Sequence, residues 1–310
     1  MKIFVTGQSS FIGRELTECC IMRGVEVVGI AANRSDLSSC SVVDIRDKAI
    51  ANYIPMNVDA VVHLAALSHH TDWRGQLMRT FDVNVMGTLN LIEAARRRHA
   101  QQFIFASSEW VYDYCDSETE KREADTIDVT ALASEYALTK LVCEIVLRQA
   151  YQQGFCPVSI LRVGNTYGPY HGNLSAVMDL VKAVTTEKEV IVGSLSTARR
   201  FIHVSDVADA ILSVVGVKGF EILNIQGPRL VSLGEIIDLS VRLLGSRPVV
   251  LERDAAHLSV RNISSRKIES LLGWYAKTSI TEGIRSVAEF LQFRPARSPF
   301  DAHNQSRNRN

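Results

Sequence analysis

The sequence has no excess of charge of either sign, because 34 Lys and Arg side chains balance 34 Asp and Glu. It therefore lacks the basic field that draws nucleic acid or an acidic membrane surface to a protein. No apolar run approaches the roughly 20 residues of a membrane span, and the opening MKIFVTG lacks the apolar stretch of a signal peptide. With 46% apolar residues over 310 positions, the composition predicts a soluble globular protein of one large domain or two intimate ones.

The cysteines and histidines show none of the spacings that mark disulfide frameworks or metal sites. The six cysteines are scattered and include no CxxC pair, which in a chain of this length is typical of reduced thiols. We therefore expect a cytoplasmic protein. His63, His69 and His70 lack metal-ligand spacing with carboxylates, so we expect no metal site and place His63 in strand packing or in a loop bond.

What the sequence does contain is an alternation of strand and helix patterns. Apolar runs predict strands at 2–6, 25–32, 60–66, 102–108 and 157–163, and helical periodicity predicts helices at 11–24, 82–99 and 135–151. Alternation of this kind predicts a parallel, doubly wound α/β sheet, in which ligands bind beyond the carboxyl ends of the strands.

After Gly168-Pro169 the pattern becomes irregular. Helices are predicted near 174–187, at 232–245 and from about 280 to 293, with short strands at VIVG and FEILNI. These segments predict a smaller α+β cap. From 295 to 310 the chain is polar and without periodicity, so we expect a disordered tail.

The segment TGQSSFIG, residues 6–13, joins the first predicted strand to the first helix. Gly7 would allow a tight turn, Gly13 would let the helix pack against the sheet, and the helix N-terminus would offer N–H groups to a pyrophosphate. Ser10 stands where such loops usually have glycine. It keeps its N–H and adds a hydroxyl donor, but it would cost roughly 1–2 kcal/mol if the backbone there needs positive φ. Taken alone, the segment fits a dinucleotide-binding loop or a plain strand–turn–helix.

Further motifs follow in order: VVDIRD, VVHLAA, NVMGTLNLIEAA, FASSEWVY, YALTK, LRVGNTYGP, RRFIHVSDVADA and LLGW. Together with TGQSSFIG they make residues 1–293 resemble the extended short-chain dehydrogenase/reductase family, the branch of nucleotide-sugar epimerases, dehydratases and ketoreductases. The resemblance implies a Rossmann-type dinucleotide-binding domain over 1–165, with segments returning near 204–226. It also implies a substrate-binding cap over 166–203 and 227–294.

Tyr136 and Lys140 lie four residues apart on a predicted helix and so share a face. An ammonium close to a phenol lowers the phenol pKa from about 10, and a tyrosine poised near neutral pH can pass a proton to or from a sugar hydroxyl or ketone. Without the other motifs, this would be an ordinary helix-surface pair. The resemblance implies that Tyr136 is the acid/base, that Lys140 holds the nicotinamide ribose and that Ser108 orients the substrate. Strand alternation turns the neighbouring Ser107 the opposite way.

Glu109 and Trp110, directly after Ser108, bear on the reaction. Related 4,6-dehydratases have an acid at the second of these places, and an indole cannot act as that base, so dehydration is disfavoured. Glu109 either contacts substrate or is a solvated loop carboxylate, and Trp110 either forms a pocket wall or packs in the core. Epimerisation at C4 and net reduction or oxidation at a sugar carbon remain. A non-catalytic dinucleotide-binding regulator and a reductase of a non-nucleotide sugar are the alternatives.

The second predicted strand ends in Ala31, Ala32, Asn33 and Arg34, without the acid that often binds the ribose diol of NAD. Arg34 or Arg14 could pair with a 2′-phosphate, which favours NADP(H) over NAD(H), unless Arg34 is a solvated loop charge. The resemblance implies the other coenzyme contacts, which are Gly7, Ser9, Ser10, Phe11, Ile12, Gly13, Asp44, Ile45, Leu64, Ala65, Ala66, Tyr136, Lys140 and Val163.

On the substrate side, the resemblance implies that Asn165 and Arg200 meet the diphosphate of a nucleotide sugar, with Arg261 or Arg253 as a second clamp. It implies that His203 and Asp206 tie the cap to the sheet, and Asn84 is expected to open its helix as a cap or to tie helix to sheet. It also implies a homodimer that pairs helices 82–99 and 135–151. Their apolar residues on more than one face are Leu89, Ile92, Val142, Ile145 and Val146.

Overall fold

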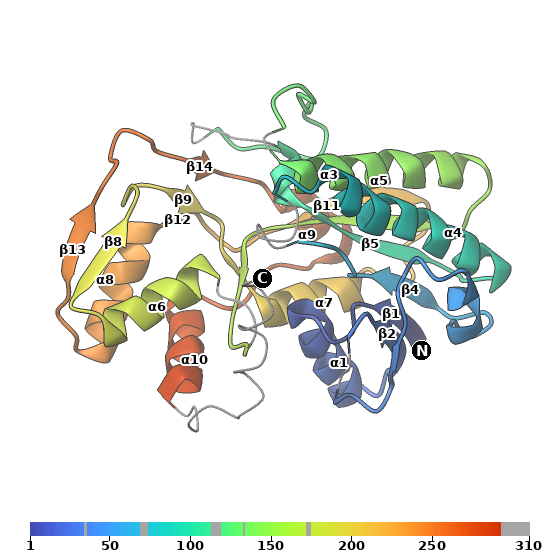
Figure 1. The fold of residues 1–310 in the computed structure, drawn as a ribbon, viewed down its shortest axis with the longest axis horizontal. Coiled ribbons are helices and arrows are strands. Elements are labelled where there is room, and N and C mark those ends of the chain that lie inside the picture. The colour runs from blue at the N-terminus through green and yellow to red at the C-terminus, as the bar shows by residue number, and fades with distance from the viewer. Residues whose placement is uncertain (34–35, 69–73, 113–118, 133, 172–174, 293–310) are drawn as a thin grey trace, which may run out of the picture.

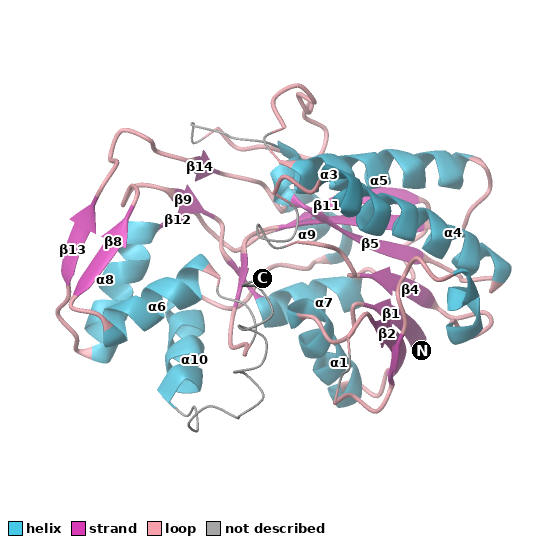
Figure 2. Ribbon diagram, viewed as in Figure 1, coloured by secondary structure: helices cyan, strands magenta, loops and turns pink. Residues whose placement is uncertain are grey.

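The computed structural model describes residues 1–33, 36–68, 74–112, 119–132, 134–171 and 175–292. Within these ranges, seven parallel strands form one sheet in the order β11-β6-β5-β4-β1-β2-β3, drawn in Figures 1 and 2. The strands are β1 (Lys2–Thr6), β2 (Glu26–Ala31), β3 (Cys40–Val42), β4 (Ala60–His63), β5 (Phe103–Ser108), β6 (Val158–Val163) and β11 (Phe220–Ile225). The predicted doubly wound parallel sheet is confirmed.

Helices cover both faces of the sheet, which explains why its strands are apolar without alternation. Ile3 and Val5 of β1 enter the core that is shared with α1 (Phe11–Met22) and α7 (Val204–Ser213). Phe4 points the other way, into the core shared with α4 (Gly87–Arg97) and α5 (Glu135–Gln152). In Figure 1, α1 and α7 lie on one side of the sheet and α4 and α5 on the other.

The helix predicted at 82–99 begins earlier than expected. It starts as α3 (Leu77–Phe81), passes through the π-helical turn η2 (Asp82–Met86) and continues as α4. Asn84 lies inside this helix and does not open it, so its expected role as a cap is wrong. Its amide instead accepts from Leu67 N (2.8 Å) and donates to Thr139 Oγ1 on α5 (3.0 Å). Asn84 therefore ties its helix to α5 and to the loop after β4, and not to a strand of the sheet as predicted.

A second body lies apart from the sheet, at the left of Figure 1. It packs α6 (Ala176–Thr186), α8 (Leu233–Leu244) and α10 (Ile280–Gln292) with β8 (Glu189–Val192) around its own apolar core, and the exposed strand β13 (Val249–Glu252) pairs with β8. Between the two bodies run β7 (Thr166–Tyr167), β9 (Ala198–Arg199), β10 (Ile202–His203), β12 (Val231–Ser232) and β14 (Val260–Arg261). The short helices are η1 (Lys48–Tyr53), η3 (Glu109–Tyr112) and α9 (Arg266–Leu272).

His203 and Asp206 connect the two bodies, as predicted. The Asp206 carboxylate on α7 accepts from Lys277 N (3.1 Å) and Thr278 N (3.0 Å), just before α10. The His203 ring nitrogen lies 3.3 Å from Ser286 Oγ on α10. Trp274, inside the range predicted as cap, packs in the sheet core. The domain limits stay a proposal, and the predicted tail lies outside the described residues.

No helix in the described ranges is both long and apolar enough to cross a membrane.

Candidate active site

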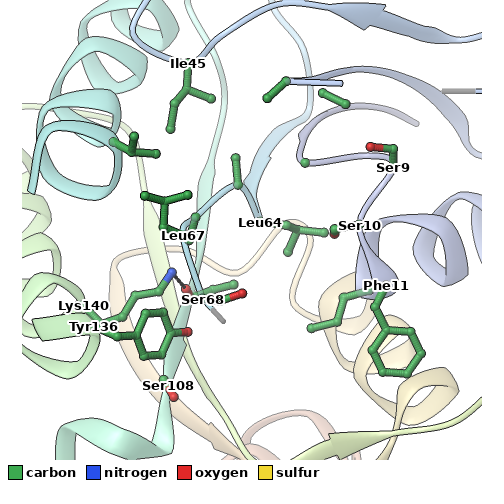
Figure 3. A pocket seen from close by; sticks show the side chains of 18 of the residues that line it. Ser9, Ser10, Phe11, Ile45, Leu64, Leu67, Ser68, Ser108, Tyr136 and Lys140 are labelled. Carbon is green, nitrogen blue, oxygen red and sulfur yellow. Dashed lines mark hydrogen bonds between the residues drawn. The ribbon is translucent and has the colours of Figure 1, made fainter. Parts of the chain in front are cut away.

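A cavity of about 660 Å³ opens at the carboxyl ends of the central strands. We call it the sheet-edge cavity; Figure 3 shows its walls, with the loop after β1 facing Tyr136 and Lys140. Most of the predicted coenzyme contacts line it, namely Gly7, Ser9, Ser10, Phe11, Ile12, Asp44, Ile45, Leu64, Ala65, Ala66, Tyr136, Lys140 and Val163. Gly13 lies behind the loop, and Arg34 is outside the described residues.

The two glycines of the loop stand where no side chain fits. Gly7 has φ +71°, and a Cβ there would lie 2.9 Å from Ala65 N. A Cβ on Gly13 would lie 2.3 Å from Gly7 O. The first turn of α1 is therefore pressed against the end of β1, with its N-terminal N–H groups at the cavity wall. A pyrophosphate fits this cradle.

Ser10 is the N-cap of α1, with φ −70° and ψ 170°. This is extended backbone, so the strain that positive φ would impose on serine does not arise. Ser10 Oγ accepts from Gly13 N (3.2 Å), while Ser10 N donates to Gly7 O (2.9 Å). The expected free N–H donor is thus used within the loop, and serine stabilises the helix start in place of the missing glycine.

The three predicted catalytic residues meet at one end of the cavity (Figure 3). Ser108 ends β5, and Tyr136 and Lys140 lie in the first two turns of α5. Lys140 Nζ donates to Ala106 O at 2.6 Å and lies 5.6 Å from the centre of the Tyr136 ring. Phenol, hydroxyl and ammonium therefore face one space.

Burial has the largest effect on the pKa values of Tyr136 and Lys140 at this end of the cavity. It raises the pKa of the Tyr136 phenol to about 12, and the hydrogen bond to Ser108 acts in the opposite direction. Burial lowers the pKa of Lys140 to about 8, opposed by Cys143 and Glu144. The spacing of Tyr136 and Lys140 predicted a lowered phenol pKa, and the direction found is the reverse. Spacing reports proximity, but it carries no information on desolvation.

His63 on β4 is buried near Lys140. Its ring nitrogens lie 2.7 Å from Thr6 Oγ1 and 2.9 Å from Thr88 Oγ1. Burial, followed by the charge of Lys140, lowers its pKa to about 3, so the ring is neutral. His63 is thus a packed strand residue, as predicted. The described residues contain no group of three or more His, Cys, Asp or Glu placed to hold a metal ion.

The opposite end of the cavity carries ion pairs that the sequence did not predict. Arg46 pairs with Asp44 (2.6 Å) and with Asp82 (2.5 Å), and the hydrogen bond from Arg46 lowers the pKa of Asp44. Arg14, a candidate partner for a 2′-phosphate, instead pairs with Asp36 at 2.6 Å.

Several lining residues gave no signal in the sequence. Tyr170 lies over the glycine loop, with its ring centre 5.1 Å from that of Phe11 and its hydroxyl 3.4 Å from Ser9 O. It follows the motif that ends in Gly168-Pro169, which is a turn signal and predicts no contact. Others missed are Ile30, Val43, Arg46, Leu67, Ser68, Arg79, Val83, Ala106, Ser107, Gly164 and Thr166.

Beyond Ser108 lies the substrate-side cluster, formed by Glu109, Trp110, Asn165 and Arg261. Glu109 is 1% exposed, so the alternative of a solvated loop carboxylate is wrong. Its Oε1 accepts from Asn165 Nδ2 (2.6 Å) and lies 3.6 Å from Arg261 Nη1, while the Arg261 guanidinium covers the Trp110 ring at 4.7 Å. Burial raises the pKa of the Glu109 carboxyl, whereas Arg261, Arg199 and Asn165 act to lower it.

Arg200 lies next to this cluster. Its Nε donates to Asn262 Oδ1 (2.8 Å), and its Nη2 lies 3.4 Å from Glu120 Oε1. Of the two candidate second clamps, Arg261 belongs to the cluster. Arg253 follows β13 in the second body, where its N donates to Val192 O at the end of β8.

A parallel sheet of this order, a glycine loop pressed against a helix start and a Tyr–Lys pair at the strand ends define a Rossmann-type nucleotide-binding enzyme. The model of the NAD dependent epimerase/dehydratase family matches residues 3–225. The chain therefore belongs to this family, within the extended short-chain dehydrogenases/reductases.

Relatives in this family carry out different reactions. A putative UDP-glucose 4-epimerase from Methanocaldococcus jannaschii is 28% identical over 307 residues, covering 94% of this chain and 98% of that protein. UDP-glucuronic acid decarboxylase 1 from Xenopus tropicalis is 24% identical over 306 residues, covering 94% and 72%. The structure of MoeE5 in complex with UDP-glucose and NAD has a TM-score of 0.83 at 27% identity, covering 94% of this chain and 99% of that one.

Proposed function

We propose that the protein epimerises a UDP-linked sugar at C4 through a transient 4-keto sugar. The observation that carries this proposal is the sheet-edge cavity, which has a pyrophosphate cradle at α1 and Ser108, Tyr136 and Lys140 together at the far side. The similar UDP-glucose 4-epimerase and the UDP-glucose complex of MoeE5 support UDP-sugars as the substrate class.

In this mechanism, a nicotinamide coenzyme held by the glycine loop supplies the hydride chemistry. Tyr136 exchanges a proton with the sugar hydroxyl that becomes a ketone. Ser108 Oγ holds that oxygen in place. Lys140 would bind the coenzyme ribose. Burial raises the phenol pKa of Tyr136 to about 12, and the hydrogen bond to Ser108 acts in the opposite direction.

The coenzyme that we propose is NAD(H). The sequence favoured NADP(H), partly because Arg14 was available to a 2′-phosphate. The Arg14 guanidinium pairs with the Asp36 carboxylate, whose charge would repel that phosphate. The NAD complex of MoeE5 agrees with this choice.

The substrate diphosphate is assigned to Asn165, a member of the substrate-side cluster, and to Arg200 next to it. Arg200 is one-fifth exposed and has a weak ion pair with Glu120, so it can turn to a phosphate at small cost. Dehydration stays disfavoured, because the Trp110 ring at the position of the missing base packs against Arg261.

The test is to incubate the purified protein with UDP-glucose, UDP-galactose and UDP-glucuronate, with and without added NAD+, and separately with a UDP-4-keto sugar and NADPH. Interconversion of C4 epimers without net coenzyme consumption supports the proposal. Stoichiometric oxidation of NADPH on a 4-keto sugar would instead identify a ketoreductase, and absence of turnover on every UDP-sugar would contradict the proposal.

We also propose a cytoplasmic homodimer. Met86, Leu89 and Ile145 are 55%, 39% and 55% exposed on the helices expected to pair, whereas Ile92, also named for that surface, is 6% exposed and belongs to the core. A monomer in sedimentation equilibrium at micromolar concentration would contradict the dimer.

A further inference from the structure

Three consecutive residues at the end of β5 each contact one residue of α5. The three α5 residues are spaced by one helical turn. Ser108 lies with Tyr136 at the cavity, Ala106 O accepts from Lys140 Nζ (2.6 Å), and Ser107 Oγ donates to Glu144 Oε1 (2.5 Å). Tyr136, Lys140 and Glu144 follow each other at i, i+4 spacing, so they form one stripe along the helix. Glu144 lies within this stripe, although no step of the mechanism above uses it.

Glu144 is held by an arginine from the neighbouring strand. Arg162 on β6 is the register partner of Ser107 and donates from Nη2 to Glu144 Oε2 (2.7 Å) and from Nε to Oε1 (3.1 Å). Both side chains are 4% exposed. A buried ion pair is costly to desolvate and gives little net stability, so stability alone is a poor reason for it.

The same arginine also fixes the chain that follows Ser108. Arg162 Nη1 donates to Tyr112 Oη (2.8 Å) in η3, and Tyr112 Oη donates to Asn224 Oδ1 on β11 (2.8 Å). Asn224 is in turn the register partner of Arg162. Ser107, Arg162 and Asn224 thus lie side by side on three strands, and the network holds the backbone on both sides of Ser108.

We propose that Glu144 and Arg162 are positioning residues, which hold Ser108 and Lys140 in register with Tyr136 and keep the Lys140 ammonium charged. This inference rests on the proposed function. Glu144 would act on Lys140 by charge and on Ser108 through Ser107, and Arg162 would act through Glu144 and Tyr112.

The effect of Glu144 on the protonation of Lys140 depends on the other titratable groups around Lys140. In the described chain, the titratable groups that face it are Tyr136, Cys143 and Glu144 on α5 and His63 on β4. His63 is neutral, and burial raises the pKa of the Cys143 thiol, which keeps it protonated at neutral pH. Glu144 is therefore the anion that opposes the loss of the Lys140 proton.

The first readout needs no substrate. Trace acetylation of Lys140 by acetic anhydride, measured by mass spectrometry as pH is raised, gives the midpoint at which this amine loses its proton. In Glu144→Gln we expect the midpoint to fall by about one pH unit. Ser107→Ala is the matched control, because it removes the hydrogen bond and leaves the Glu144 charge, so the midpoint should not move.

The second readout is kinetic. For Glu144→Gln we expect kcat to fall about 10- to 100-fold, with KM changed less than threefold and the rising limb of the pH–rate profile displaced. If Glu144→Gln does not fold because Arg162 is left unpaired, Glu144→Gln/Arg162→Met removes both charges and should show the same midpoint shift.

An unchanged Lys140 midpoint together with an unchanged pH–rate profile in the folded variant would overturn the proposal. A wild-type protein that acetylates as expected but converts no UDP-sugar would instead contradict the proposed function and leave the titration result standing.

Discussion

The two ends of the site are built in different ways. At the coenzyme end, the glycine loop and small side chains such as Ala65 and Ala66 line the cavity, and the ion pairs of Arg46 and Arg14 there are partly exposed. At the substrate end, a carboxylate and a guanidinium, Glu109 and Arg261, are almost fully buried side by side. Under the proposed function, backbone shape holds the coenzyme, whereas buried charge joins the chain segments beside the substrate.

The largest effect is expected from Tyr136→Phe. Removing the phenol hydroxyl removes proton transfer and should lower kcat about 10³-fold, while coenzyme affinity, set at the other end of the cavity, stays within about threefold. Steady-state kinetics measure kcat, and a coenzyme titration measures the coenzyme affinity. Tyr151→Phe, on the same helix but packed against Phe220, is the control, and an equal loss in both variants would refute the assignment.

Glu109→Gln should have the next largest effect, because it leaves the buried Arg261 charge without its carboxylate. We expect a loss of about 3 kcal/mol in the free energy of unfolding. Urea denaturation measures it. The double variant Glu109→Gln/Arg261→Met should recover most of that stability but not activity. If the single variant is as stable as wild type, the substrate end is not held by this pair.

The buried His63 predicts that the free energy of unfolding depends on pH. Its folded pKa of about 3 lies below the ordinary value of 6.5, so the unfolded chain binds the extra proton first. The stabilisation is complete above pH 6.5 and is lost as pH falls toward 3, by at most about 1.4 kcal/mol per pH unit. Denaturation at several pH values should show a flatter slope in His63→Gln. Asp254 raises the pKa of the exposed His257, which acts on stability in the opposite direction, so His257→Gln should not flatten the slope.

The smallest effect is expected at the rim, where Asp36 and Arg14 are partly exposed. Asp36→Ala would free Arg14 for a 2′-phosphate, so the ratio of NADP to NAD affinity should rise several-fold. Coenzyme titration by fluorescence measures the ratio. No change would mean that Arg14 does not face the adenosine ribose.

The contrast between the two ends also explains what the sequence could predict. Periodicity and glycine spacing identified the sheet and the α1 loop, because backbone geometry depends on local residue types, and the family resemblance supplied the other residues of the cavity wall. Glu109, Asn165 and Arg261 were named for the substrate side, but their pairing with one another was not predictable, since they come from segments far apart in the chain. The Tyr136 pKa was predicted in the wrong direction for a related reason, because burial depends on tertiary packing.

The central claim is that a hydride leaves and returns to one sugar carbon inside the sheet-edge cavity. The direct measurement uses UDP-glucose deuterated at C4 and follows the label in the product by mass spectrometry. The account predicts UDP-galactose that keeps deuterium at C4 without net coenzyme change. Product whose C4 deuterium has been replaced from solvent would contradict it.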